Sequence, residues 1–196
     1  QIFKSLSDNE KVFAGHLEKL KSLDYDALDV RATRWHEDFN TQFKNSLRDL
    51  EVMTQNIINT AFANVSTVAG GVELLEAFQV LAWCESIKRC VEKKVTDILS
   101  SFIKQCAQYK RHFESYRHAP PVHPDEPRNG GGADWASGLR REIGNDWKYI
   151  FDAVRAMDQS MVRAAVVHEA KTEYRALMTV FNEYIIKQYH DCHFEK

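Results

Sequence analysis

Residues 86–116 read SIKRCVEKKVTDILSSFIKQCAQYKRHFESY, and this stretch decides the fold class. Its apolar side chains recur in steps of three or four residues, which places them on one face of an α-helix. The members of this stripe are Ile87, Val91, Val95, Ile98, Phe102, Cys106, Tyr109 and Phe113. The stretch therefore predicts one long amphipathic helix whose apolar face is buried.

The same spacing recurs on both sides of this helix. It predicts further helices over about 27–64, 72–83, 135–154 and 158–190. Gly70-Gly71 is expected to separate the helix over 27–64 from the helix over 72–83, because glycine costs about 1 kcal/mol inside a helix. No sustained two-residue alternation or hairpin turn signals a strand. We therefore expect an all-α fold of elongated antiparallel helical bundles in series, with long helices and no sheet.

The stripes also predict which side chains face inward in two of these helices. In the helix over 27–64 the expected inward residues are Trp35, Phe39, Phe43, Leu47, Leu50, Ile57, Ala61 and Phe62. In the last helix they are Met161, Ala165, His168, Tyr174, Met178, Phe181 and Ile185. Most of the steps are again three or four residues, as one helical face requires.

All four prolines lie between Pro120 and Pro127, and proline is the strongest helix breaker. They predict a helical bundle over 1–118, a Pro/Gly-rich linker over 119–133, and a second bundle over 134–196 that continues beyond the chain. The linker includes Gly130-Gly131-Gly132 and is expected to have no regular structure. Asp134 would then cap the following helix.

The composition is that of a globular chain that can bury a core. Hydrophobic residues make up 44% of its 196 residues, and the net charge of −2 offers no basic excess for nucleic acid or an anionic membrane. No apolar run approaches the roughly 18 residues of a membrane helix. The four cysteines form no CxxC pair, which favours a reducing compartment. The chain opens without Met and ends in a helical pattern, so we expect a fragment of a larger protein.

The glycine run and the three possible metal ligands near the C-terminus are weak candidates for binding sites. Gly130-Gly131-Gly132 lacks the preceding strand and following Lys-Ser/Thr of a phosphate loop. His190, Cys192 and His193 lack the further ligand that structural zinc requires. A flexible linker and a solvated helix end are the favoured interpretations.

The cysteines, histidines and carboxylates are equally weak candidates for catalytic residues. Cys84 or Cys90 could pair with a distant histidine, but buried helical cysteines are far commoner than catalytic ones. The expected surface histidines are His112, His118 and His123. No pair of carboxylates stands out as an acid and base. We expect no catalytic, cofactor-binding or metal-binding residue, and hence no enzyme activity in this segment.

Basic residues form two groups on the expected helices. One is Lys88, Arg89, Lys93 and Lys94, and the other is Arg140 and Arg141. Solvated helix faces are the ordinary interpretation of such groups. The alternative is a partner-binding surface, because basic clusters promote salt-sensitive docking to acidic partners.

Several motifs, taken in order, resemble the N-terminal tail of dynein heavy chains. The first are Asp29, Phe39, the stretch Phe43–Met53 with its Asp49-Leu50-Glu51, and Gly71–Phe78 with Leu74-Leu75-Glu76-Ala77-Phe78. After the prolines Pro120-Pro121 come Trp135, Leu139–Ile143, Trp147 and the run from Tyr174 through Met178 to Tyr184. Each motif is short, and their order over the chain from about residue 25 gives the resemblance its specificity. The insert from Pro121 to Gly132 looks more like an axonemal heavy chain than a cytoplasmic one.

The resemblance implies a non-catalytic tail segment that links the motor mechanically to its cargo or doublet microtubule. It implies docking of dynein intermediate chains, light chains and neighbouring heavy chains, with only indirect microtubule contact. ATP and Mg would belong to the motor region of the parent chain, and this segment would hold no cofactor. The implied location is the cytoplasm and cytoskeleton, in the axoneme of a cilium or flagellum.

Two other classes of function stay open at this point. A generic helical scaffold or tethering module, such as a spectrin-like repeat, would repeat its tryptophans about every hundred residues. Trp35 and Trp135 have that spacing, but the residues around them differ. A helical enzyme with a buried metal or cysteine site is the third alternative.

Overall fold

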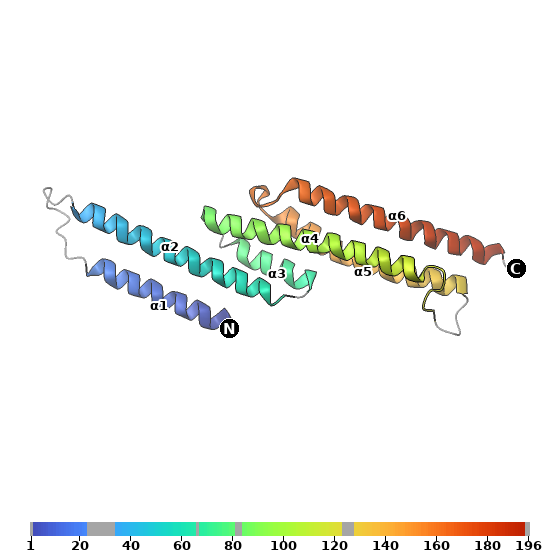
Figure 1. Cartoon of the computed structure of the whole chain (residues 1–196), viewed down its shortest axis with the longest axis horizontal. Helices are drawn as coiled ribbons and strands as arrows, with labels where there is room; N and C mark the ends of the chain where they lie inside the picture. Colours follow the sequence, from blue (N-terminus) through green and yellow to red (C-terminus); the bar gives the residue numbers. More distant parts are fainter. Residues whose placement is uncertain (1, 23–33, 66, 81–83, 123–127, 195–196) are drawn as a thin grey trace. The chain divides into compact units, whose positions relative to one another are not determined.

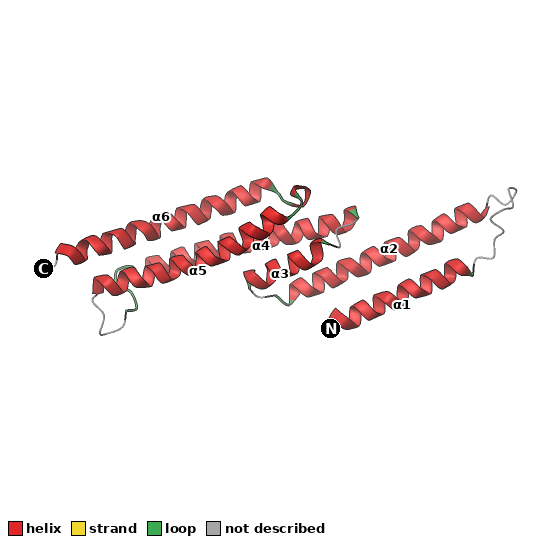
Figure 2. Ribbon diagram, turned by 180° about the vertical axis from the view of Figure 1, so that it is seen from behind, coloured by secondary structure: helices red, strands yellow, loops and turns green. Residues whose placement is uncertain are grey.

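The computed structural model describes residues 2–22, 34–65, 67–80, 84–122 and 128–194. Over these ranges the chain forms six α-helices and a 3₁₀ turn, with no strand (Figure 1, Figure 2). The elements are α1 (Ile2–Lys21), α2 (Arg34–Ala63), α3 (Val68–Gln79), α4 (Glu85–Tyr116), α5 (Arg128–Ala156), η1 (Gln159–Met161) and α6 (Ala164–Phe194). The predicted all-α fold is confirmed. Among the helices as described, none has the length and apolar character needed to cross a membrane.

The chain divides into two compact units by its internal packing. Unit 1 comprises Gln1–Val65 and Leu81–Cys90, and unit 2 comprises Ser66–Val80 and Val91–Lys196. Unit 2 contains helices from both sides of the proline-rich segment, since α3 packs against α5. The packing units therefore do not coincide with the blocks 1–118 and 134–196. The division into two helical bundles stays a prediction.

Unit 1 is built on an antiparallel hairpin of α1 and α2 (Figure 1). The apolar stripe of α2 is buried only toward its C-terminal end, at Ile57 and Ala61. Phe39 and Phe43 are 40% and 45% exposed, so their predicted inward position is wrong. The hairpin therefore leaves the stripe uncovered at Phe39 and Phe43. The side chain of Trp35 lies outside the described residues.

Unit 2 contains α4 from Val91 onward together with α5 and α6, and each of these three helices is antiparallel to the one before (Figure 1, Figure 2). The stripe predicted for residues 86–116 is confirmed for six positions, which are Ile87, Val91, Val95, Phe102, Cys106 and Phe113. Ile98 and Tyr109 are half-buried. Large aromatic rings join the three helices, because Phe113 lies 5.7 Å from Trp135 on α5 and 5.2 Å from Phe181 on α6, centroid to centroid.

The inward face of α6 differs in part from its prediction. Met161, Phe181 and Ile185 are buried as predicted. Ala165 and His168 are exposed, and Ala170 and Leu177 are buried instead. The helix begins at Ala164 rather than near residue 158, because Asp158 caps the turn η1 by accepting a hydrogen bond from the Ser160 amide at 2.9 Å.

The triple glycine is helical, contrary to prediction. The helix α5 begins at Arg128, so residues 128–133 of the expected linker have regular structure and Asp134 is not a cap. Gly131 and Gly132 are buried. A Cβ atom at Gly132 would lie 3.0 Å from the Tyr184 hydroxyl and 3.3 Å from Cγ of Pro120. The absence of a side chain thus permits close packing that outweighs the low helix propensity of glycine.

Gly70-Gly71 also lies inside a helix, and its predicted role as a break is wrong. The helix α3 begins at Val68, with Thr67 as its cap accepting a hydrogen bond from the Gly70 amide at 3.2 Å. Gly71 is buried. The Gly71 amide donates to the Thr67 carbonyl at 3.1 Å, so both glycine amides are hydrogen-bonded in the first turn. The predicted residues 81–83 of this helix lie outside the described residues.

Candidate functional site: basic side chains of α4 and α5

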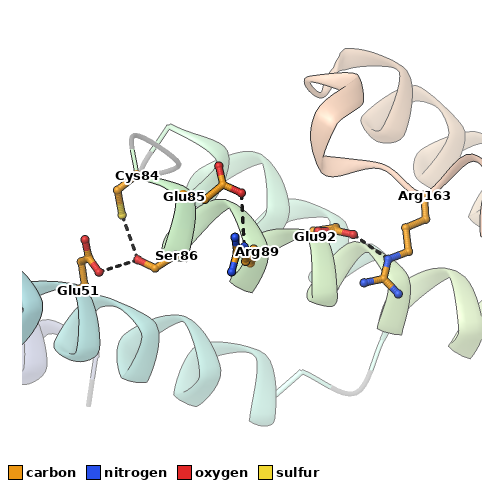
Figure 3. Close-up of polar contacts among 7 residues, drawn as sticks. All are labelled: Glu51, Cys84, Glu85, Ser86, Arg89, Glu92 and Arg163. Atoms are coloured by element: carbon orange, nitrogen blue, oxygen red, sulfur yellow. Dashed lines mark hydrogen bonds and ion pairs between the residues drawn. The ribbon is translucent and has the colours of Figure 1, made fainter.

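The first basic group lies along the N-terminal part of α4. Arg89 and Lys93 are exposed, whereas Lys88 and Lys94 are half-buried. Arg89 Nε lies 3.4 Å from Glu85 Oε1, one turn earlier on the same helix (Figure 3). Such an exposed pair contributes only about 0.3–0.5 kcal/mol, so Arg89 can exchange it for another carboxylate at little cost.

The second basic group lies on α5. Arg140 and Arg141 are both exposed. Arg140 Nη1 donates a hydrogen bond to Asn182 Oδ1 of α6 at 2.8 Å. Arg140 therefore contributes to joining α5 and α6, and Arg141 is the member of this group with no hydrogen bond or ion pair among the residues that the structure describes.

The structure does not bring the two groups together within unit 2. Tyr109 of α4 donates a hydrogen bond to Glu142 of α5 at 3.0 Å, which puts Arg141 level with Tyr109. Lys93 lies roughly 24 Å away along α4, at 1.5 Å per residue. Within unit 2, Lys93 and Arg141 therefore do not form one compact anion site.

Acidic residues interrupt the basic character of α4. Glu92 Oε1 accepts a hydrogen bond from Arg163 Nε at 2.7 Å (Figure 3). Asp97 is exposed one turn after Lys93. The outer face of α4 therefore carries mixed charge. Mixed charge is typical of the polar rim of a protein–protein interface, whereas a surface that binds a polyanion is uniformly basic.

Cys84 belongs to a hydrogen-bonded chain in unit 1. Its Sγ lies 3.2 Å from Ser86 Oγ, and the Ser86 hydroxyl donates to Glu51 Oε2 at 2.8 Å (Figure 3). The chain joins α2 to the start of α4 and contains no imidazole to serve as a base. These contacts support a structural role for Cys84.

Cys106 is buried in the core of unit 2. Burial, and second to it the charge of Glu173, raise the pKa of its thiol to about 12. The thiol is therefore protonated near neutral pH, whereas the thiolate is the reactive form. Burial and a hydrogen bond to Glu142 likewise raise the pKa of the Tyr109 hydroxyl to about 12.

The histidines and the C-terminal cysteine give no metal site in the described ranges. There, no three His, Cys, Asp or Glu side chains are arranged to hold an ion. His112 packs against the rings of Tyr116 and Trp135, with centroids 5.0 and 6.1 Å away. His123 and the side chains of Cys192 and His193 lie outside the described residues. The predicted lack of catalytic, cofactor and metal residues stays a prediction.

One surface feature has no local signal in the sequence. A groove of about 350 Å³ lies where α5 ends and α6 begins, and its apolar lining includes Phe151 and Val167. These residues come from separate elements, so neither helical stripe reveals the groove. The antiparallel packing of α5 on α6 creates it.

Comparison with known proteins gives a consistent set of matches. The family model for the dynein heavy chain, N-terminal region 1, matches residues 1–193. The dynein-1-beta heavy chain of the flagellar inner arm I1 complex from Chlamydomonas reinhardtii is 36% identical over 97% of this chain and 4% of its own length. Dynein axonemal heavy chain 2 from Mus musculus is 40% identical over 73% of this chain and 3% of its own length.

The dynein beta chain of the flagellar outer arm from Chlamydomonas reinhardtii is also similar, at 29% identity over 88% of this chain. This chain spans only about 4% of that relative's length as well. The family model covers residues 1–193, which include the motifs from Phe43 to Tyr184. The chain therefore belongs to the dynein heavy chain family, as part of its N-terminal region.

Proposed function

We propose that this chain is a non-catalytic tail segment of an axonemal-type dynein heavy chain. It links the motor mechanically within a ciliary or flagellar complex and docks intermediate chains, light chains and neighbouring heavy chains. The observation that carries the proposal is the match to the N-terminal heavy-chain region over residues 1–193. The names of the relatives, which specify axonemal or flagellar dyneins, support the axonemal type and a location in the axonemal cytoskeleton.

The packing of unit 2 supports the mechanical role. The helices α5 and α6 have 29 and 31 residues, so each extends for roughly 44–47 Å at 1.5 Å per residue. Buried residues recur from Ala133 to Val154 on α5 and from Ala170 to Ile185 on α6. Apolar contacts repeated along two helices distribute a pulling force, so no single contact carries the whole load.

The exposed basic groups support the docking role. Arg89, Lys93 and Arg141 stand at the surface with weak or no internal partners in the described part of the chain. Basic side chains at an interface rim accelerate association with acidic partners and specify orientation. ATP, Mg and direct microtubule contact then belong to other regions of the heavy chain.

Charge reversal in the complete heavy chain tests the docking role. Lys93→Glu with Arg141→Glu should reduce the intermediate or light chains that co-sediment with the purified dynein at physiological salt. A variant with Lys104→Glu and Arg111→Glu is the matched control, because both residues are exposed on α4 outside the two groups. Full subunit content in the first variant, or equal loss in the control, contradicts docking at these residues.

The non-catalytic part of the proposal has its own test. The purified 196-residue chain should show a helical circular dichroism spectrum and no ATP turnover above that of buffer. Hydrolysis that co-purifies with the folded chain and survives removal of contaminating ATPases overturns it. Because the family model covers residues 1–193, the generic scaffold or tethering alternative is set aside.

A further inference from the structure

The groove at the α5–α6 turn has an apolar floor. It is lined by Phe151 and Val154 of α5, Val162 after η1, and Val167 of α6, and its volume is about 350 Å³. Phe151, Val162 and Val167 are half-buried, so each keeps part of its apolar surface in contact with solvent. A volume of this size falls within the range of protein sites that receive apolar groups.

The walls of the groove are held by contacts that do not depend on an occupant. Asp158 caps η1 through the Ser160 amide at 2.9 Å. Arg163, just before α6, donates to Glu92 of α4 at 2.7 Å. Met157 and Met161 are buried beneath the turn. The groove is therefore preformed, and binding carries no free-energy cost for ordering its walls.

The rim of the groove carries uncompensated positive charge. Arg155 and Lys171 supply this charge, and no carboxylate lines the groove. In the described ranges, neither Arg155 nor Lys171 forms an ion pair, whereas the neighbouring Arg163 is neutralised by Glu92. Apolar surface bordered by unpaired cations is complementary to a segment that combines apolar side chains with carboxylates.

We propose that this groove docks an acidic amphipathic segment of a partner protein. Its apolar side chains lie on Phe151, Val162 and Val167, and its carboxylates pair with Arg155 and Lys171. An amphipathic helix seated between two helices is an established mode of recognition. The site is separate from the basic groups of the proposed function, and its chemistry holds whether or not those groups dock subunits.

A designed peptide provides the probe, because the partner is defined by chemistry alone. The probe is a fluorescent amphipathic helix with leucines at i, i+3, i+4 and i+7 and glutamates on both flanks. Fluorescence anisotropy with the 196-residue chain should show saturable binding that weakens as salt rises. Arg155→Glu with Lys171→Glu should reduce the affinity by at least about tenfold.

Two further variants separate docking from general charge and folding effects. Lys104→Glu with Arg111→Glu changes the net charge equally on exposed residues of α4 and should keep the affinity. Ala164→Trp, at an exposed residue that lines the groove, should block it without changing charge. Circular dichroism checks that each variant keeps its helical content.

A reciprocal exchange completes the test. A peptide with lysines in place of the glutamates should bind the Arg155→Glu, Lys171→Glu variant more tightly than the unaltered chain. The proposal is overturned if the acidic peptide does not bind saturably, if the α4 control loses as much affinity, or if Ala164→Trp leaves it unchanged. It is also overturned if phosphatidylserine vesicles bind the rim and the peptide does not. Self-association abolished by the same charge reversal, without peptide binding, assigns the groove to a second copy.

Discussion

The hairpin of α1 and α2 and the three antiparallel helices α4 to α6 carry similar apolar stripes but bury them differently. In unit 2 the phenylalanines Phe102, Phe113 and Phe181 are almost completely buried. In the hairpin, Phe13, Phe39 and Phe43 are each at least 40% exposed. Within the hairpin α1 packs against α2, whereas Phe113 lies against rings of two other helices. The ring of Phe113 is thus covered by two helices, whereas Phe39 and Phe43 keep a large exposed area.

The exposed phenylalanines mark the hairpin as an incomplete hydrophobic layer. The rings of Phe39 and Phe43 stack with centroids 6.3 Å apart, which shields only part of each. Contiguous apolar surface of this kind is costly in water and usually meets another protein surface. Stability is therefore expected to depend on unit 2, and association on the hairpin.

The largest expected effect comes from removing a ring at the centre of unit 2. Phe113→Ala should lower the free energy of unfolding by about 3–5 kcal/mol, because the ring is buried between Trp135, Phe181 and Tyr184. Urea unfolding followed by circular dichroism measures the change. A loss below about 1 kcal/mol contradicts a central role for this cluster.

A substitution at the buried glycine tests close packing in the same unit. Gly132→Val should destabilise the fold by about 1–3 kcal/mol, because its side chain meets the Tyr184 hydroxyl and Pro120. Gly138→Val is the matched control, since a Cβ atom there has nothing within 4 Å. Equal effects at the two positions show that helix propensity, rather than packing, determines the outcome.

The buried thiol predicts a pH dependence for unit 2. The pKa of Cys106 is raised from 9.0 to about 12, so the folded state holds this proton more tightly than the unfolded state. That contribution is complete below pH 9.0 and is lost as pH rises toward about 12. Urea midpoints should therefore fall over this range. Cys106→Val, which removes the titrating group, should make the fall shallower, and an unchanged slope disproves the assignment.

The smallest effect is expected in the hairpin. Phe43→Ala should change the free energy of unfolding by less than about 1 kcal/mol, because the side chain is 45% exposed. The same substitution should reduce concentration-dependent self-association in sedimentation experiments, since it removes exposed apolar area. A loss as large as that of Phe113→Ala shows that Phe43 is buried in solution and removes the contrast between the two regions.

The sequence predicted the fold class and the long central helix because both follow from local periodicity. The α4 stripe from Ile87 to Phe113 keeps its three- and four-residue steps for the whole helix, and nothing in between breaks it. Any partner helix must then lie on that face. Helices that follow one another along the chain usually lie side by side, which accounts for the antiparallel arrangement of α4, α5 and α6.

The errors arise where the outcome depends on distant residues. Nothing in the sequence near Gly132 indicates that the Tyr184 hydroxyl packs against it, so the three glycines predict a linker. Nothing near Phe39 indicates that this end of the α2 stripe stays exposed. The groove beside Val167 depends in the same way on where α5 ends. For the basic residues, sequence predicts surface position well, because charged side chains are costly to bury. It does not predict which of them, such as Arg140, are used within the chain.

The contacts of Tyr184 bear on how the family can vary in length. Its hydroxyl donates to the Arg117 carbonyl at the end of α4, 3.1 Å away, and lies against Gly132 near the start of α5. One side chain of α6 thereby positions both ends of the connection between α4 and α5. Doubling the length of a segment between two fixed ends costs only about 0.6 kcal/mol. Insertions and deletions between Val122 and Arg128 should therefore accumulate during evolution without moving the three helices.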